Sequence, residues 1–289
     1  MTEEIAAGLV QPDWLEERLF DRDLRVVDAS WHLPVAGRDA RSEHAQLRLP
    51  GAIYVDLSTD LARRDAAVRN TIAGPEELGA AFGRLGIGTA HHVIVYDALG
   101  GYSAGRIWWA LRYAGHPRVS LLDGGLPRWL AEGRPVHSHP PAASEPVPFE
   151  VRARSGLLRS LEEVRAGLED GEMQIVDARS PARFAGTGEE HTKHRGRIPG
   201  SVNVPHAINL SGDPPRFLSP DQLREIYTGA GVDLSRSIVT SCGSGVTAAL
   251  DAFVLTRLGC GDVAVYDGSW AEWGDRDDVP IEVGGQSER

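Results

Sequence analysis

The chain has 289 residues, enough for two domains of ordinary size, and 42% of them are hydrophobic, which allows a sizeable core. A formal net charge of −11 without a basic run argues against nucleic acid or a membrane surface as a main partner. Two cysteines make no disulfide framework, and neither a spanning apolar run nor a secretory signal is recognisable, so the sequence predicts a cytoplasmic protein with free thiols.

Short apolar runs alternate with stretches of helical period along the chain. The runs predict buried strands, and the stretches 74–86 (GPEELGAAFGRLG) and 219–231 (SPDQLREIYTGAG) predict helices. Ser219 is a candidate N-cap, and the following Pro220 and Asp221 fit a first helical turn better than a capping box. The alternation predicts an α/β fold with mostly parallel sheets, with strand-like runs at 26–28, 52–57, 92–97, 118–125, 175–177 and 237–242.

Four blocks of the N-terminal half recur in the same order in the C-terminal half. Asp177 follows Asp28 by 149 residues, Pro199 follows Pro50 by 149, and Asp267 follows Asp123 by 144. The nearly constant spacing indicates a tandem duplication, with a period too long for a solenoid. We place an N-terminal domain at 1–138, a linker rich in Pro and Ala at 139–154, and a C-terminal domain at 155–289. The matched blocks are 24–31 with 173–180, 49–57 with 198–206, 92–111 with 237–255, and 119–129 with 263–273.

The stretch VTSCGSGVTAAL (239–250) puts Cys242 between a predicted strand and a predicted helix, at what reads as an exposed junction. Gly243 and Gly245 allow positive φ, so that successive N–H groups form an anion-binding nest around the sulfur. The positive end of the following helix dipole acts at the same point. Such a setting favours the thiolate, which is the nucleophilic form of cysteine. By contrast, Cys260 is expected to be a small buried residue.

Spacing weighs against other cysteine chemistries. A phosphatase loop needs an arginine six residues after the cysteine, where this chain has Ala248, and a redox pair needs a second cysteine where it has Gly245. No Cys and His cluster suggests a metal, so we expect neither a metal nor a cofactor. A distant histidine of the papain type stays open.

The chain resembles tandem-domain members of the rhodanese family. The resemblance rests on DARSPARFAG (177–186), GRIPGSVNVP (196–205), SCGSGVTA (241–248) and YDGSWAEWG (266–274). It implies two rhodanese-like domains, each a mostly parallel sheet flanked by helices. The loop CGSGVT (242–247) looks most like that of the 3-mercaptopyruvate sulfurtransferases. In the N-terminal half Asp97 takes the place of the cysteine, which implies a structural, catalytically inactive domain.

The resemblance implies sulfur transfer through a Cys242 persulfide, from a small-molecule donor to a thiol such as thioredoxin or a small thiol, or to cyanide. Relatives that prefer thiosulfate carry basic residues in the loop where this chain has Gly243 and Ser244, so 3-mercaptopyruvate is the expected donor. Two alternatives stay open: thiosulfate as donor with the same mechanism, and a non-enzymatic sulfur-binding or redox-sensing module.

The resemblance also implies roles for individual residues. Cys242 and Ser244 are expected to act in catalysis, although Ser244 and Thr247 could instead cap a helix. Arg183 is expected to hold the substrate carboxylate as a bidentate fork. No second arginine aligns cleanly. The remaining candidates are Asp56 in catalysis, Lys193 and Arg195 in place of the second arginine, Trp31 at the cleft, and Gly243, Gly245, Val246 and Thr247 in the loop.

One expected partner is missing. Where the family's Asp–His–Ser arrangement has a histidine between Asp56 and Ser244, this chain reads Asn70, which cannot relay a proton.

Overall fold

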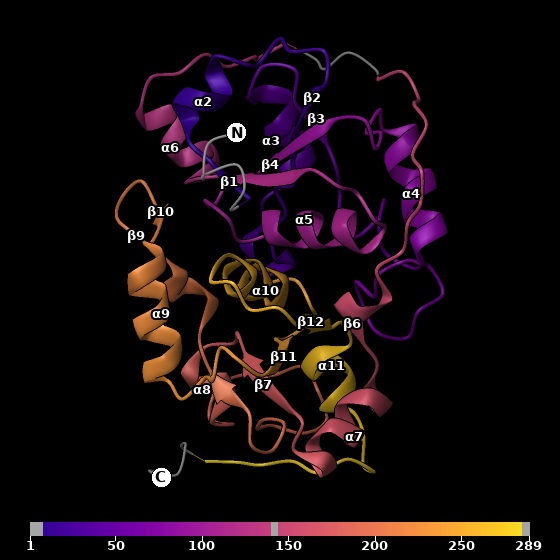
Figure 1. Ribbon diagram of the computed structural model, residues 1–289, viewed down its shortest axis with the longest axis vertical. Coiled ribbons are helices and arrows are strands. Elements are labelled where there is room, and N and C mark those ends of the chain that lie inside the picture. The colour runs from indigo at the N-terminus through magenta and orange to yellow at the C-terminus, as the bar shows by residue number, and fades with distance from the viewer. Residues whose placement is uncertain (1–7, 140–143, 285–289) are drawn as a thin grey trace. The chain divides into compact units, whose positions relative to one another are not determined.

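The computed structural model describes residues 8–139 and 144–284 (Figure 1). It divides into two compact units. The N-terminal unit comprises residues up to 64, 72–154 and 210–217, and the C-terminal unit comprises 65–71, 155–209 and 218 onward. The domain boundaries given above stay a prediction, and residues 140–143 of the predicted linker lie outside the described residues.

The N-terminal unit is built on a five-stranded sheet in the order β1-β5-β4-β2-β3, and every pairing in it is parallel. The central strands end at one edge, with Asp97 directly after β4. The strands are β1 (Leu9–Val10), β2 (Leu24–Asp28), β3 (Ile53–Tyr54), β4 (His92–Tyr96) and β5 (Val119–Leu122).

The helices of this unit bury apolar faces against its sheet. Leu15 of α2 and Trp129 of α6 join strand residues in one core cluster, and α5 is buried along nearly its whole length. The helices are α2 (Pro12–Glu16), the short 3₁₀ turn η1 (Pro34–Ala36), α3 (Ala40–Gln46), α4 (Pro75–Arg84), α5 (Ala104–Tyr113) and α6 (Gly125–Ala131). A two-stranded antiparallel ladder of β9 (Leu210–Ser211) and β10 (Arg216–Phe217) is grouped with this unit.

The C-terminal unit repeats the same design. Its sheet has the order β6-β12-β11-β7-β8, again parallel throughout, so each strand has a counterpart in the first unit. This confirms the predicted duplication and the α/β class. The strands are β6 (Leu158–Arg159), β7 (Met173–Asp177), β8 (Val202–Asn203), β11 (Ser237–Ser241) and β12 (Val263–Tyr266).

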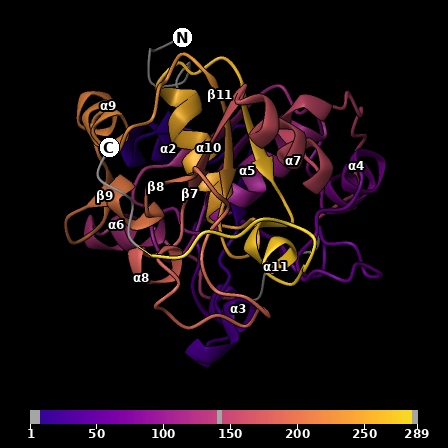
Figure 2. The same ribbon diagram turned by 90° about the horizontal axis from the view of Figure 1, so that it is seen from below.

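Helices cover both faces of this second sheet. Figures 1 and 2 show α10 on one face and α7 with α11 on the other. The second face carries a core in which Val164 of α7 and Trp270 and Trp273 of α11 pack on Val239 of β11. The helices are α7 (Leu161–Asp170), α8 (Pro181–Phe184), α9 (Pro220–Gly229), α10 (Ala248–Arg257) and α11 (Ser269–Trp273), with 3₁₀ turns η2 (Ser155–Leu157) and η3 (His206–Asn209).

The predicted N-cap at Ser219 is confirmed, and the judgement against a capping box there is wrong. Ser219 Oγ accepts the Gln222 N–H, and the Gln222 side chain accepts the Ser219 N–H in return. Pro220 at the first helical position does not interfere, because its missing N–H would have no partner in the helix.

The linker segment from residue 144 to residue 154 has no regular structure and is anchored on the N-terminal unit. The Val147 N–H donates to the Gly83 carbonyl, and Phe149 stacks on Phe82 with ring centroids 5.7 Å apart. Across the described ranges, no helix combines the length and apolar character that crossing a bilayer requires.

Candidate active site

Cys242 follows β11, the central strand of the C-terminal sheet, at the carboxyl end where open parallel sheets bind ligands. It is only 2% exposed, so the expectation of an exposed cysteine is wrong. The Cys242 N–H donates to Ser269 Oγ at 3.1 Å, and its carbonyl accepts the Trp270 N–H at 3.0 Å. The first turn of α11 therefore covers the cysteine backbone and fixes its position.

The cysteine loop (residues 242–247) runs from β11 into α10. Its two glycines, Gly243 and Gly245, are required for different reasons. Gly245 has φ 75°, the left-handed conformation that favours glycine. Gly243 does not have a positive φ. Instead, a Cβ at Gly243 would lie 2.9 Å from Arg183 Nη2, closer than such contacts normally come, so this glycine lets Arg183 approach the loop.

The hydroxyls of the cysteine loop do not cap α10. Thr247 holds the N-cap position but makes no side-chain cap hydrogen bond, and it is buried together with Val246. Ser244 is partly exposed, and its Oγ has no hydrogen bond with another described residue. Ser244 thus keeps a hydroxyl that a bound molecule could use.

The N-terminal unit shows what a loop of this type can hold. After β4 the aspartate loop (residues 97–103) leads into α5, and its first residue, Asp97, is 1% exposed. The Asp97 carboxylate accepts four backbone N–H groups, from Leu99, Gly101, Ser103 and Ala104, at 2.7–2.9 Å. Asp97 stands where Cys242 stands in the repeat, so this loop design is an anion-binding nest occupied by the chain's own carboxylate.

Arg183, on α8, lies beside the cysteine loop and is already paired. Its Nε and Nη2 donate to the two oxygens of Glu190 at 2.9 and 2.7 Å, a bidentate ion pair. The Glu190 side chain is 3% exposed, whereas that of Arg183 is 37% exposed. One edge of the Arg183 guanidinium is therefore held by a carboxylate of the same chain, and its role in binding the substrate carboxylate stays a prediction.

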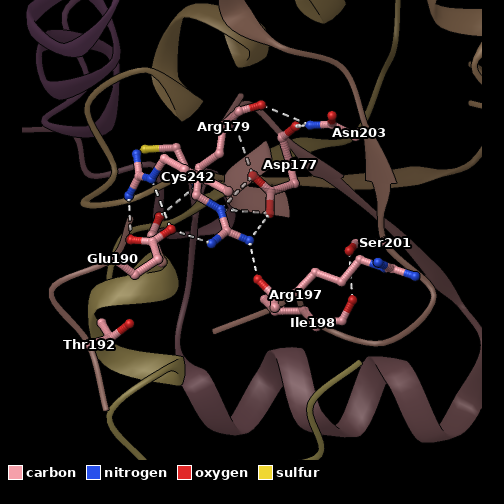
Figure 3. A network of polar contacts seen from close by, with 12 residues as sticks. Asp177, Arg179, Glu190, Thr192, Arg197, Ile198, Ser201, Asn203 and Cys242 are labelled. Carbon is pink, nitrogen blue, oxygen red and sulfur yellow. Dashed lines mark hydrogen bonds and ion pairs between the residues drawn. The ribbon is translucent and has the colours of Figure 1, made fainter. Parts of the chain in front are cut away.

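Glu190 also contacts Arg179, which is fully buried. Arg179 Nη1 donates to Glu190 at 2.8 Å, and its other nitrogens donate to Asp177 and to the Gly196 carbonyl. Figure 3 shows this network next to Cys242. Although burial acts to lower the pKa of Arg179, the carboxylates of Asp177 and Glu190 outweigh it and raise that pKa.

Sequence reasoning missed Glu190 and Arg179. Arg179 follows strand β7, whose carboxyl end lies at the same sheet edge as that of β11, and this placement was a usable signal. Glu190 stands in an irregular segment that carries no periodic pattern, so nothing pointed to it.

The two candidates for a second cation lie at the protein surface. Lys193 pairs with Asp277, and its side chain is 54% exposed. Arg195 is exposed, and no contact in the described ranges joins it to the cysteine loop. Their roles in substrate binding stay predictions.

Asp56 and Trp31 belong to the N-terminal unit and are linked to each other through Ser58. Trp31 Nε1 donates to Ser58 Oγ at 2.8 Å, and the Ser58 N–H donates to Asp56 Oδ1 at 2.8 Å. Their catalytic and binding roles stay predictions. Asn70 has φ 63°, a left-handed conformation that asparagine tolerates better than most residues, which gives a backbone reason for its presence.

Cys260 is buried, as expected, and burial raises the pKa of its thiol. In the described residues, no group of three or more His, Cys, Asp or Glu side chains is arranged to hold a metal ion.

This fold and this cysteine site are those of a rhodanese-like protein. The family profile described as Rhodanese-like domain matches residues 11–132 and again 160–276, and the chain belongs to this family. The chain is 40% identical to human 3-mercaptopyruvate sulfurtransferase and 39% identical to bovine thiosulfate sulfurtransferase. Those alignments cover 93% and 92% of this chain, and 93% and 91% of the relatives.

A solved structure shows the same architecture. The 3-mercaptopyruvate sulfotransferase SseA of Escherichia coli superposes with a TM-score of 0.83 at 31% identity, covering 91% of this chain and 98% of that one. The chain is accordingly a sulfurtransferase enzyme, and the non-enzymatic alternative loses its support. The relatives named for the two donors are nearly equally similar, so overall identity does not choose between the donors.

Proposed function

We propose that this enzyme transfers sulfur from 3-mercaptopyruvate to a thiol or cyanide through a persulfide on Cys242. The observation that carries the proposal is the composition of the site beside Cys242. The cysteine loop contains no basic residue, and the nearby Arg183 is balanced by Glu190.

Charge at this site favours a monoanionic donor over a dianion. Arg179 and Arg183 face Asp177 and Glu190, so the four side chains sum to no net charge. Thiosulfate brings two negative charges into this neutral surrounding, whereas 3-mercaptopyruvate brings one carboxylate. Because the site has no surplus positive charge, it attracts the second negative charge of thiosulfate only weakly. Removing water from that charge still costs free energy, so thiosulfate binding is disfavoured.

The first half-reaction forms the persulfide. The Cys242 thiolate attacks the donor sulfur, the carbon–sulfur bond breaks, and its electron pair leaves on the pyruvate enolate. The proton from the donor thiol ends on the enolate carbon, giving pyruvate, while the anionic persulfide stays on the enzyme. Ser244 Oγ is our candidate for donating a hydrogen bond to the enolate oxygen, because it has no partner in the described chain.

The second half-reaction returns the enzyme to its starting state. An acceptor thiolate attacks the outer sulfur, the sulfur–sulfur bond breaks, and the electron pair returns to Cys242 as thiolate. Cyanide does the same and leaves as thiocyanate. The anionic persulfide would be stabilised by loop N–H groups, as the Asp97 carboxylate is in the other unit. We propose that Asp97 makes the N-terminal domain catalytically inactive, since a carboxylate cannot form a persulfide.

Thioredoxin or a small thiol is the acceptor that we propose, and a cytoplasmic location is part of the same proposal. Both cysteines are free thiols, which suits a reducing compartment.

The test is the ratio of kcat/KM for 3-mercaptopyruvate and thiosulfate, measured with cyanide as the common acceptor. We expect a preference for 3-mercaptopyruvate of about tenfold or more, equivalent to ~1.4 kcal/mol or more. Cys242→Ser should lose both activities, and Cys260→Ser, the matched control, should keep both. A preference for thiosulfate would assign the enzyme to the other donor.

A further inference from the structure

A cavity of about 690 Å³ lies wholly within the N-terminal unit. Its lining residues come from α3, the segment around β3, the end of α4, and positions 137, 139 and 144, and Figure 1 labels α3, β3 and α4. Every lining side chain that can carry charge near neutral pH is basic, and none is acidic, in a chain of net charge −11. These basic residues are Arg41, His44, Arg48, Arg84, His137 and His139.

The arginines of this cavity have no carboxylate partner within the described ranges. Arg48 is 2% exposed, and its Nη1 donates only to the His44 carbonyl, at 3.3 Å. Arg41 and Arg84 are exposed and form no ion pair. Asp39, near Arg41, accepts the backbone N–H of that residue rather than its guanidinium. Burying a guanidinium without a counterion is costly, so a bound anion would stabilise the site.

His44 supplies a second, independent observation. Its ring is 3% exposed, and Nδ1 lies 2.8 Å from Asp28 Oδ2. Asp28 also accepts hydrogen bonds from the Tyr96 hydroxyl and the Ser30 N–H, so it is the acceptor and Nδ1 is the donor. Nε2, on the opposite edge of a ring that lines the cavity, is buried and has no hydrogen-bond partner in the described chain.

We propose that this cavity binds the phosphate group of a small phosphorylated molecule. Planar guanidinium groups match phosphate oxygens in bidentate geometry, and here they are uncompensated. A single phosphate does not fill about 690 Å³, a volume within the range of small-molecule sites, which leaves room for an organic part.

His44 favours phosphate over carboxylate or sulfate. Because Nδ1 donates to Asp28, Nε2 is the ring nitrogen left for a ligand, and it can accept a hydrogen bond from a ligand that carries a proton. The second ionisation of a phosphate monoester has a pKa of about 6, so phosphate can share a proton with Nε2 near neutrality. Carboxylate and sulfate hold no proton at that pH and cannot make this hydrogen bond.

Calorimetric titration of the full-length protein with inorganic phosphate, sulfate and glycerol phosphate, at one ionic strength and pH, tests the proposal. Matched ionic strength is needed because salt screens these charges. We expect saturable binding at one site per chain, with phosphate tighter than sulfate. A tighter fit of glycerol phosphate than of inorganic phosphate would identify the ligand as organic, and the reverse would identify free phosphate.

Variants connect the binding to the cavity. Arg41→Gln with Arg84→Gln removes two exposed charges without disturbing the core, and binding should weaken by roughly ten- to a hundred-fold. His44→Asn keeps a donor to Asp28 but removes Nε2, so the preference for phosphate over sulfate should disappear. Arg22→Gln, an exposed arginine outside the cavity lining, is the control and should bind like the wild type.

Sulfurtransferase activity and melting temperature of each variant show that it has folded. No saturable binding of any anion, equal binding of phosphate and sulfate by the wild type, or full binding by the double arginine variant would each overturn the proposal. None of these results bears on Cys242, so the proposed donor chemistry is tested separately.

Discussion

Replacing Glu190 by glutamine changes the charge beside Cys242 with little change in shape. The Glu190 carboxylate accepts three hydrogen bonds from Arg179 and Arg183, and its side chain is 3% exposed. Glutamine keeps one acceptor oxygen and replaces the other by an amide that faces a guanidinium. The four-residue network then carries a net charge of +1 instead of zero.

The size of the effect on donor choice follows from Coulomb's law. At roughly 8 Å and an effective dielectric constant of about 20, one extra unit charge is worth about 2 kcal/mol. Thiosulfate carries one more negative charge than 3-mercaptopyruvate. The extra positive charge therefore stabilises bound thiosulfate by that amount more than it stabilises bound 3-mercaptopyruvate. Because Arg183 is 37% exposed, solvent screening reduces the gain, and we expect the thiosulfate to 3-mercaptopyruvate ratio of kcat/KM to rise by about tenfold.

The assay is the ratio of kcat/KM for the two donors with cyanide as acceptor, in wild type and Glu190→Gln. Glu189→Gln is the matched control, since the neighbouring Glu189 is exposed and the change in charge is identical. It should leave the ratio within about twofold, as exposed charges are largely screened. An unchanged ratio in Glu190→Gln, or a shift towards 3-mercaptopyruvate, would refute the reasoning.

Three further changes have defined outcomes. Gly243→Ala places a methyl group 2.9 Å from Arg183 Nη2, so KM for 3-mercaptopyruvate should rise several-fold in steady-state assays, while Gly261→Ala, with open space around it, should not change KM. Asp97→Ala removes the acceptor of four backbone N–H groups, three of them buried, and should lower the free energy of unfolding by about 3 kcal/mol or more in denaturant titration. Asp97→Asn, which keeps one oxygen, should lose less. Asp251→Asn should remove a pH-dependent loss of stability, because burial raises the pKa of this carboxyl well above its ordinary value.

The direction of the Asp251 effect follows from proton linkage. The unfolded chain releases the proton at a pKa of 3.8, and the folded chain holds it to higher pH, so wild-type stability falls as the pH rises above that value. The melting temperature of Asp251→Asn minus that of wild type should therefore grow between acid and neutral pH. A difference that stays constant would contradict the assignment. An equal KM for 3-mercaptopyruvate in Gly243→Ala and Gly261→Ala would contradict the first prediction. No loss of unfolding free energy in Asp97→Ala would contradict the second.

Much of the fold was predictable because it depends on local pattern and on repetition. The apolar runs predicted β2, β3, β4 and β5 of the first sheet and β7 and β11 of the second. The nearly constant spacing of the repeated blocks predicted two similar units, and the structure adds that they share one strand order. The position of Cys242 after a central strand also followed, since strand-to-helix turns in α/β units meet at one edge of the sheet.

The parts that the sequence did not predict depend on segments distant in the chain. The backbone of Cys242 is held by α11, which begins 27 residues later with Ser269. The Arg183–Glu190 pair depends on the path of an irregular segment with no periodic pattern. Gly243 reads as a residue needed for positive φ, yet its role is to admit the Arg183 side chain, which only the packing reveals.

The persulfide on Cys242 is the central claim, and intact-protein mass spectrometry tests it directly. The reduced enzyme is mixed with 3-mercaptopyruvate without an acceptor, weighed, and weighed again after a thiol is added. We expect a gain of one sulfur atom in the wild type and in Cys260→Ser, no gain in Cys242→Ser, and loss of the added mass with the thiol. No gain in the wild type, or a gain that persists in Cys242→Ser, would contradict it.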